Sequence, residues 1–195
     1  MSLQLYLASS SPRRKELLQQ IGISFEVLVP QVEEKPEPDE SPVEYVERIA
    51  LAKARAVEML VHQQNLQPWP ILAADTCVCL DAELMGKPAD IQDGLRMLRL
   101  LSGTSHQVFS GIALLHDGQA FAGHSESSVT FGELSEEEII RYWDSGEPQD
   151  KAGSYAIQGM AGKFVSSITG SYSGIVGLPL YEVYQLLKKA GLVKT

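Results

Sequence analysis

The chain has 195 residues, which is enough for one domain, or for two small packed lobes, around a substantial core. Hydrophobic residues make up 44% and charged residues 21%, a composition that excludes a disordered chain. The formal net charge of −9 argues against nucleic acid or an anionic membrane as partner, but a few local cations would suffice for a small anionic ligand.

The cysteine content and the hydropathy pattern predict the compartment. Cys77 and Cys79 are the only two cysteines, and on a strand both would point to the same face, which does not suit a structural disulfide. We therefore expect a cytoplasmic protein with reduced thiols. No apolar run approaches the about 20 residues that a membrane-spanning helix needs, and the N-terminal residues do not resemble a signal peptide.

The first half of the chain alternates predicted strands and helices. The pattern predicts a strand at 3–8, a helix at 12–21, a strand at 24–29, an acidic loop at 30–41, a helix at 42–61 and a strand at 70–74 that continues extended over 77–80. Ser11 and Ser41 each precede a proline at a first helical position, so both are predicted N-caps. Gly22 ends the first helix.

The second half contains the strongest turn signal. It predicts a helix at 91–101 capped by Asp90, strands at 105–115 and 119–131, a helix at 136–145 opened by a capping box at Ser135, loops and short strands at 146–177, and a last helix at 179–190. Asp117-Gly118 between two alternating runs indicates a hairpin. Strands and helices that alternate before a hairpin predict a single α/β domain over residues 1–195, with a mixed sheet and flanking helices.

The first candidate site is the run Ala-Ser-Ser-Ser-Pro-Arg-Arg at residues 8–14, where a strand turns into a helix. The unpaired N–H groups and the dipole of a helix N-terminus attract anions. Arg13 and Arg14 in the first turn oppose that dipole, a cost that a nearby anion would offset, and guanidinium groups suit phosphate. The same pattern also fits a capped surface helix with solvated arginines.

Lys53 is the second candidate, because it lies inside an apolar stripe. The helix at 42–61 has a face formed by Val46, Ile49, Ala50, Ala54, Val57 and Leu60. A lysine on that face must either extend its ammonium to solvent or meet an anion, and the sequence leaves both alternatives open.

Asp75 is the third candidate, because it follows the apolar strand at 70–74. Ligands of open α/β sheets bind at the carboxyl ends of strands, where a carboxylate can hold a divalent cation or accept a proton. The alternative is an Asp that forms a turn with Thr76. Lys87 in Gly-Lys-Pro, and Glu33 and Glu34 in the acidic loop, are weak signals by themselves.

Several common sites are absent from the sequence. It contains no P-loop, no Rossmann glycine motif and no nucleophile elbow, and its four scattered histidines do not form a zinc site.

Together the ordered motifs resemble the Maf family of nucleoside triphosphate pyrophosphatases over nearly the whole chain. The matching runs are Leu7–Arg14, Glu33-Glu34, Ala52–Ala54, Ala74–Thr76, Gly86–Pro88, Leu101–Gly103, His106–Val108, Asp150–Gly159 and Gly177–Leu180. Asp75-Thr76, Tyr155–Gly159 and Gly170–Tyr172 look like the branch that acts on dTTP and UTP.

The resemblance implies a Maf/inosine-triphosphatase-like fold, with a mixed twisted sheet and flanking helices in two lobes around a cleft. It implies hydrolysis between the α- and β-phosphates, to the monophosphate and pyrophosphate, with Mg²⁺ or Mn²⁺ as the divalent cation. Asp75 would accept the proton of the attacking water. The other implied roles are triphosphate binding by Ser9, Arg13, Arg14, Lys53 and Lys87, metal binding by Glu34, Glu33 and Asp75, and base preference set by Arg13, Thr76 and Gln158.

The resemblance also implies that the protein is a homodimer. Its binding partner would be a small nucleoside triphosphate, and it would bind neither nucleic acid nor a membrane. Because Maf proteins are associated with arrest of septum formation, a nucleotide-binding regulator of cell division is the alternative. The same reaction on a modified purine triphosphate, such as 7-methyl-GTP, is the second enzymatic alternative. Asp75 separates enzyme from regulator, since a sensor needs no carboxylate beside the phosphates.

Overall fold

The computed structural model describes residues 3–81 and 83–193, which form two compact units. Unit 1 contains the described residues up to Asp75, residues 110–125 and the described residues from Gly177 onward. Unit 2 contains the described residues between Thr76 and Phe109, and residues 126–176. The elements, in chain order, are β1 (Gln4–Leu7), α1 (Pro12–Gln20), β2 (Ser24–Val27), α2 (Pro42–Gln63), β3 (Ile71–Leu80), β4 (Glu83–Met85), α3 (Ile91–Leu101), β5 (Ser105–His116), β6 (Gln119–Phe131), α4 (Glu136–Asp144), η1 (Glu147–Asp150), η2 (Ala152–Ser154), η3 (Met160–Phe164), β7 (Val165–Thr169), α5 (Tyr172–Val176) and α6 (Leu180–Lys189).

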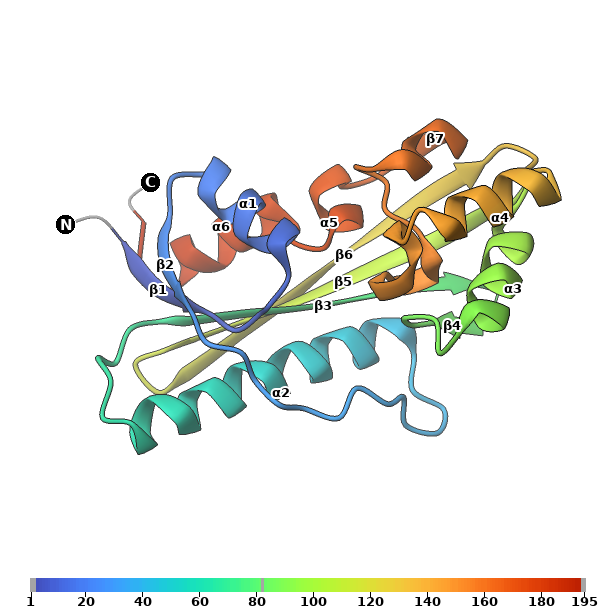
Figure 1. The fold of residues 1–195 in the computed structure, drawn as a ribbon. Helices are drawn as coiled ribbons and strands as arrows, with labels where there is room; N and C mark the ends of the chain where they lie inside the picture. The colour runs from blue at the N-terminus through green and yellow to red at the C-terminus, as the bar shows by residue number, and fades with distance from the viewer. Residues whose placement is uncertain (1–2, 82, 194–195) are drawn as a thin grey trace. The chain divides into compact units, whose positions relative to one another are not determined.

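The strands of the described chain form one seven-stranded mixed sheet (Figure 1). The strand order is β2-β1-β3-β5-β6-β7, and β4 pairs with β3 outside this path. β1 is parallel to β2 and β3, whereas β4 and β7 are antiparallel to their neighbours. Asp117 and Gly118 both have positive φ, 48° and 72°, so the predicted hairpin is closed by a type I′ turn. The predicted mixed α/β class is therefore confirmed.

In unit 1, helices cover both faces of the strands. α2 begins with the predicted capping box, because Ser41 and Glu44 each bond the other's backbone N–H. Its buried alanines Ala50 and Ala54 pack against Tyr6 of β1 in one apolar cluster. α1 and α6 lie on the opposite side of these strands (Figure 1). Unit 1 is thus a layer of strands between helices.

In unit 2, α3 and α4 lie side by side (Figure 1). Both predicted caps are present: Asp90 accepts the N–H of Asp93 over 2.9 Å, and Ser135 forms a capping box with Glu138. The largest fully buried side chains of the unit 2 core are Met85, Leu98, Leu101, Phe131 and Tyr142.

Three local predictions need correction. Ser11 precedes α1, but its side chain makes no capping hydrogen bond. β3 does not end before Asp75, since it continues to Leu80, where its second half pairs with β4. Residues 146–177 contain three 3₁₀ helices and α5 besides β7, because turns this short have too few residues to show a periodic pattern.

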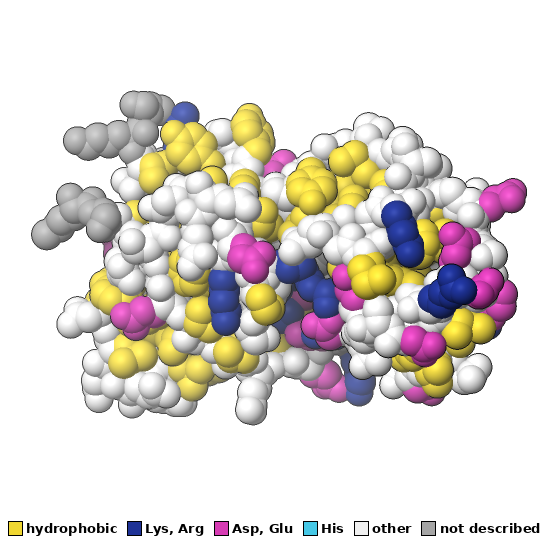
Figure 2. All heavy atoms as spheres, turned by 45° about the horizontal axis from the view of Figure 1, so that its top comes forward, with side chains coloured by type: hydrophobic (Ala, Val, Ile, Leu, Met, Phe, Trp, Pro, Cys, Tyr) yellow, Lys and Arg dark blue, Asp and Glu magenta, His cyan; other side chains and the backbone are white. Residues whose placement is uncertain are grey.

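The surface and the cysteines agree with the composition. On the face drawn in Figure 2, Lys and Arg side chains lie next to Asp and Glu side chains and form no extended basic area. Cys77 and Cys79 are buried and form no disulfide, as predicted. In residues 3–81 and 83–193, no helix combines the length and the apolarity needed to cross a membrane. The expected single domain and the expected cleft between lobes stay predictions.

Candidate functional site

The loop between β1 and α1 is organised around the hydroxyl of Ser9. Ser9 is only 6% exposed, and its Oγ accepts the N–H of Ser11 over 3.2 Å. The same Oγ accepts a hydrogen bond from Nη1 of Arg14 over 3.3 Å. The serine therefore holds the loop in a turn and orients an arginine of the first helical turn. Arg13 lies beside Arg14 and is half-buried.

Arg14 connects this loop to the segment before α6. Its Nε donates to the carbonyl of Gly177 over 2.8 Å. Burial lowers the pKa of Arg14, although the carboxylates of Asp75 and Glu34 act in the opposite direction. Arg14 thus has a structural role in addition to the charge that it brings to the carboxylates.

Lys53 lies between two carboxylates. Its Nζ is 2.7 Å from Oδ1 of Asp75 and 2.8 Å from Oε1 of Glu34. The side chain of Lys53 is 9% exposed and that of Asp75 is 6% exposed. Of the two alternatives that the sequence left open, the anionic partner is the one observed. A buried charge of either sign is expensive without such a partner.

The surroundings of Asp75 raise its pKa. Burial raises the pKa of Asp75 above its ordinary value, and this outweighs the nearby cations Lys53 and Arg14, which lower it. Glu34 raises the pKa further. The contact of Lys53 with Asp75 is made to Oδ1 of the carboxyl group.

Asp75 lies at a carboxyl edge even though it is not at the end of its own strand. The last residue pair between β1 and β3 is Leu7 with Leu72, after which β1 gives way to the Ser9 loop. Asp75 lies three residues beyond that pair along β3. Asp75 thus lies beyond the carboxyl end of the neighbouring parallel strand β1, which is where ligands bind in open α/β sheets.

Two side chains of α2 hold the acidic loop that carries Glu34. The hydroxyl of Tyr45 donates to the carbonyl of Glu34 over 3.4 Å. Arg48 forms a two-pronged pair with Glu40, at 2.5 and 2.7 Å, and donates to the carbonyl of Lys35 over 2.9 Å. Hydrogen bonds to Arg48 lower the pKa of Glu40. These contacts attach the loop to α2 at Glu34 and at Lys35 and Glu40, which follow it.

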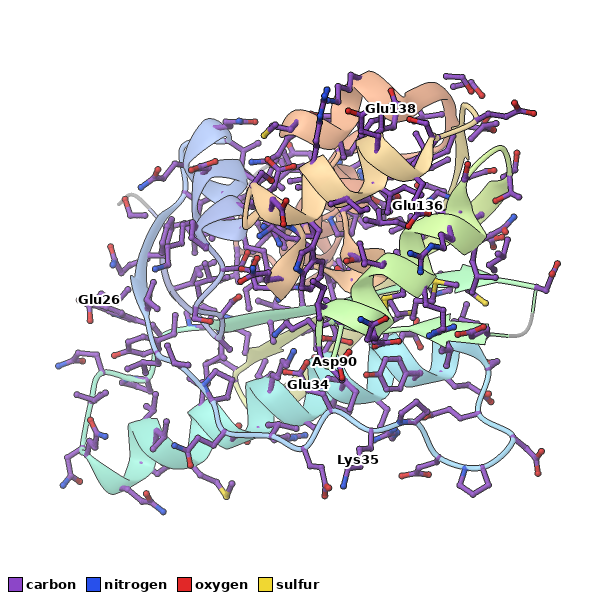
Figure 3. All side chains as sticks on the ribbon, turned by 45° about the vertical axis from the view of Figure 1, so that its right-hand side comes forward. Glu26, Glu34, Lys35, Asp90, Glu136 and Glu138 are labelled. Carbon is purple, nitrogen blue, oxygen red and sulfur yellow. The ribbon has the colours of Figure 1, made fainter. Side chains whose placement is uncertain are left out.

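Glu33 does not belong to this cluster. Its carboxylate is 73% exposed and pairs with Lys35 at 2.5 Å. Figure 3 shows Glu34 and Lys35 pointing to opposite sides of the loop. Of the two adjacent glutamates, only Glu34 reaches Lys53.

The remaining predicted residues belong to unit 2. Thr76 follows Asp75 in β3 and is half-buried, whereas Lys87 and Gln158 are exposed. The segment of Lys87 is fixed within unit 2, because the N–H of Gly153 donates to the carbonyl of Gly86 over 3.1 Å. The structure thus brings together Ser9, Arg14, Glu34, Lys53 and Asp75 within unit 1, whereas Thr76, Lys87 and Gln158 belong to unit 2.

Comparison with known proteins identifies the family. A family model described as Maf-like protein matches residues 4–190. The chain belongs to the Maf family. A relative from Alkalilimnicola ehrlichii is 53% identical over 184 residues, 94% of this chain and 91% of the relative. A relative from Bordetella pertussis is 50% identical over 97% of this chain and 93% of its own length. A relative from Vibrio cholerae is also 50% identical, over 95% of this chain and 97% of its own length. All three are named dTTP/UTP pyrophosphatase.

The carboxylates of this Maf chain fit a divalent cation in their chemistry. Glu34 and Asp75 converge on one cationic atom, Nζ of Lys53, and carboxylate oxygens are the ligands that Mg²⁺ and Mn²⁺ prefer. Among the described residues no group of three or more His, Cys, Asp or Glu side chains could hold a metal. Magnesium sites with one or two carboxylates are usually completed by substrate phosphates and water.

Sequence reasoning missed the residues of the Maf chain that position its candidate site. Tyr45 lies two helical turns before Lys53 on the same buried face, which is a signal that could have been used. Arg48 lies outside the apolar stripe and therefore looks solvated. The carbonyl of Gly177 carries no sequence signal, since any residue has one.

Proposed function

We propose that the chain is a nucleoside triphosphate pyrophosphatase that hydrolyses dTTP and UTP to the monophosphate and pyrophosphate, with Mg²⁺ or Mn²⁺. The names of the Maf relatives support the reaction and the substrates. The observation that carries the proposal is the buried pair of Asp75 and Lys53, which places a base and a cation 2.7 Å apart. A cytoplasmic homodimer remains part of the proposal.

The cations of the candidate site would bind the triphosphate. Lys53 has three N–H donors, of which two are directed at Asp75 and Glu34, so the third is left for a phosphate oxygen. Arg13, Arg14 and the Ser9 loop would bind further phosphate oxygens at the start of α1. Lys87 would contribute a further cation, as the resemblance implies. Phosphoryl transfer depends mainly on such positioning and neutralisation of charge.

Asp75 would accept the proton of the attacking water at Oδ2 while Lys53 holds Oδ1. The raised pKa of Asp75 makes it a stronger base than an ordinary carboxylate, as general base catalysis requires. Glu34 and Asp75 would hold the divalent cation. When bound, the cation would neutralise negative charge on the phosphates. Glu33, exposed and paired with Lys35, would at most contribute through water.

The family resemblance implies that Gln158, Arg13 and Thr76 set the base preference. Gln158 presents an amide that can donate and accept, as the edge of a pyrimidine requires. Arg13 and Thr76 would complete the discrimination, as the family resemblance implies.

The proposal is tested by incubating the protein with dTTP, UTP, dATP and GTP in the presence of Mg²⁺ or Mn²⁺ and identifying the products by phosphorus NMR. We expect dTMP or UMP with pyrophosphate, and much slower turnover of the purines. Release of inorganic phosphate instead of pyrophosphate, or equal turnover of all four, would contradict the proposal. Binding without turnover would favour the regulator of septum formation.

A further inference from the structure

Residues 155–161 of unit 2 are held by a buried tyrosine. Tyr142 of α4 is fully buried, and its hydroxyl accepts the N–H of Ala156 over 3.0 Å. The same hydroxyl donates to Oε1 of Glu147 over 2.7 Å. Burial, and secondarily Glu147, raise the pKa of Tyr142, so the hydroxyl keeps its proton and can serve as donor and acceptor together. One end of the segment is thereby fixed through its backbone.

Glu147 fixes the other end. Its carboxylate accepts the N–H of Met160 over 3.0 Å and that of Ala161 over 3.4 Å, so it caps the first turn of η3. Burial raises the pKa of Glu147, but the hydrogen bonds from Met160, Tyr142 and Ala161 outweigh this and hold the pKa below its ordinary value. The group is therefore a carboxylate at neutral pH, and it serves three donors at once.

Gly159 leaves the space that this carboxylate occupies. A Cβ at position 159 would lie 2.1 Å from Oε2 of Glu147, so the carboxylate would have to move from its present position. The carboxylate of Glu147 can therefore occupy this position because residue 159 has no side chain. The close approach of the backbone is what lets one carboxylate reach two consecutive N–H groups.

A second buried contact holds the start of the segment. Nε2 of His106 and the hydroxyl of Tyr155 are 2.9 Å apart, and the ring of Phe131 packs edge-on against both. Burial lowers the pKa of His106 to about 4, so the imidazole is neutral at pH 7. The segment is therefore anchored to the core of unit 2 at Tyr155, Ala156 and Met160.

Between these anchors lie Ile157, Gln158 and Gly159, and Gln158 is exposed. A stretch of three residues between fixed backbone positions has little conformational freedom left to lose when a ligand binds. We propose that Tyr142 and Glu147 are positioning residues, which hold the backbone so that the amide of Gln158 is preset for recognition of the nucleobase. This inference rests on the proposed function, since it assumes that Gln158 reads the base.

The test uses Tyr142→Phe and Glu147→Gln, each of which keeps the size of the side chain. Ser102→Ala is the matched control, because it also removes a side-chain acceptor of a backbone N–H in unit 2, that of Leu134, away from the segment. We expect both test variants to raise KM for dTTP about tenfold, the effect of about one lost hydrogen bond, with much smaller changes in kcat. The control should keep the KM of the wild type.

A double-mutant cycle with Gln158→Ala separates positioning from general destabilisation. If Glu147 acts through Gln158, Glu147→Gln should leave KM nearly unchanged in the Gln158→Ala background. Losses that multiply, as for independent sites, would overturn the proposal. So would test variants whose KM for dTTP equals that of the wild type.

Amide hydrogen exchange tests the positioning role of Tyr142 and Glu147 without an activity assay. In the ligand-free protein, Tyr142→Phe and Glu147→Gln should accelerate exchange at Ala156, Met160 and Ala161, with other amides of unit 2 unchanged. If the wild type does not turn over dTTP, the proposed function fails, and the role of Gln158 in recognition fails with it. If turnover is normal but exchange at these amides is unaltered in both variants, the positioning role alone is overturned.

Discussion

At the scale of the residue, the candidate site depends on Lys53. Helical spacing predicted that Lys53 lies in the buried stripe of α2, and it does. The identity of its partners could not be predicted from spacing, because Glu34 and Asp75 come from a loop and a strand far away in the sequence. The burial of Asp75 gives the pair its chemical interest, since burial raises the pKa of this carboxyl.

Lys53→Met is expected to shift the pH dependence of the reaction. Asp75 must be ionised to accept a proton, so activity falls as the pH drops through the pKa of Asp75. Lys53 lowers this pKa, and its removal should therefore move the acidic limb of kcat/KM to higher pH, by about one unit or more. The measurement is a pH profile of pyrophosphate release from dTTP.

Lys35→Met is the matched control, because Lys35 pairs only with the exposed carboxylate of Glu33 among the described side chains. Its profile should coincide with that of the wild type, since exposed pairs contribute little. An acidic limb that stays in place in Lys53→Met, or moves to lower pH, would show that Asp75 is not the titrating group.

At the scale of the element, local signals predicted most helix starts. The capping boxes at Ser41 and Ser135 and the Asp117-Gly118 turn are short, chemically defined patterns, and all three are present in the structure. The 3₁₀ helices lacked such a signal. The loop at 30–41 was predicted as a loop, but its attachment to α2 was not, because Arg48 contacts Glu40 across a turn whose shape the sequence does not specify.

Arg48→Met is expected to loosen the loop that carries Glu34. Arg48 has three hydrogen bonds to this loop, so its loss should allow Glu34 to move away from Lys53. If Glu34 holds the divalent cation, the Mg²⁺ concentration for half-maximal activity should rise about tenfold or more, as it does when residues behind a metal ligand are removed. A titration of activity with Mg²⁺ measures this.

Arg55→Met serves as the comparison, since Arg55 lies on the same helix and pairs with Glu58 within it. Its Mg²⁺ requirement should equal that of the wild type. Equal requirements in both variants would mean that the loop keeps Glu34 in place without Arg48, or that Glu34 is not a ligand.

At the scale of the whole molecule, the order of the motifs was more informative than any one of them. The matched runs extend from Leu7 to Leu180, and the family model covers 4–190. The residues that the motifs single out fall into a cluster in unit 1 and a second set in unit 2. Sequence reasoning could predict the members of both sets but not their hydrogen bonds, which depend on long-range contacts such as Arg14 with Gly177.

The central claim is that Asp75 is the base of a pyrophosphatase. The most direct measurement compares kcat for pyrophosphate release from dTTP in the wild type, Asp75→Asn and Asp117→Asn. Asp117 is an exposed aspartate of the hairpin turn, where asparagine is equally suited to a positive φ. We predict a loss of about 10² to 10⁴ in Asp75→Asn with dTTP binding retained, as expected for a missing general base, and no loss in Asp117→Asn. Turnover by Asp75→Asn within about threefold of the wild type, at the saturating substrate that kcat requires, would contradict the account.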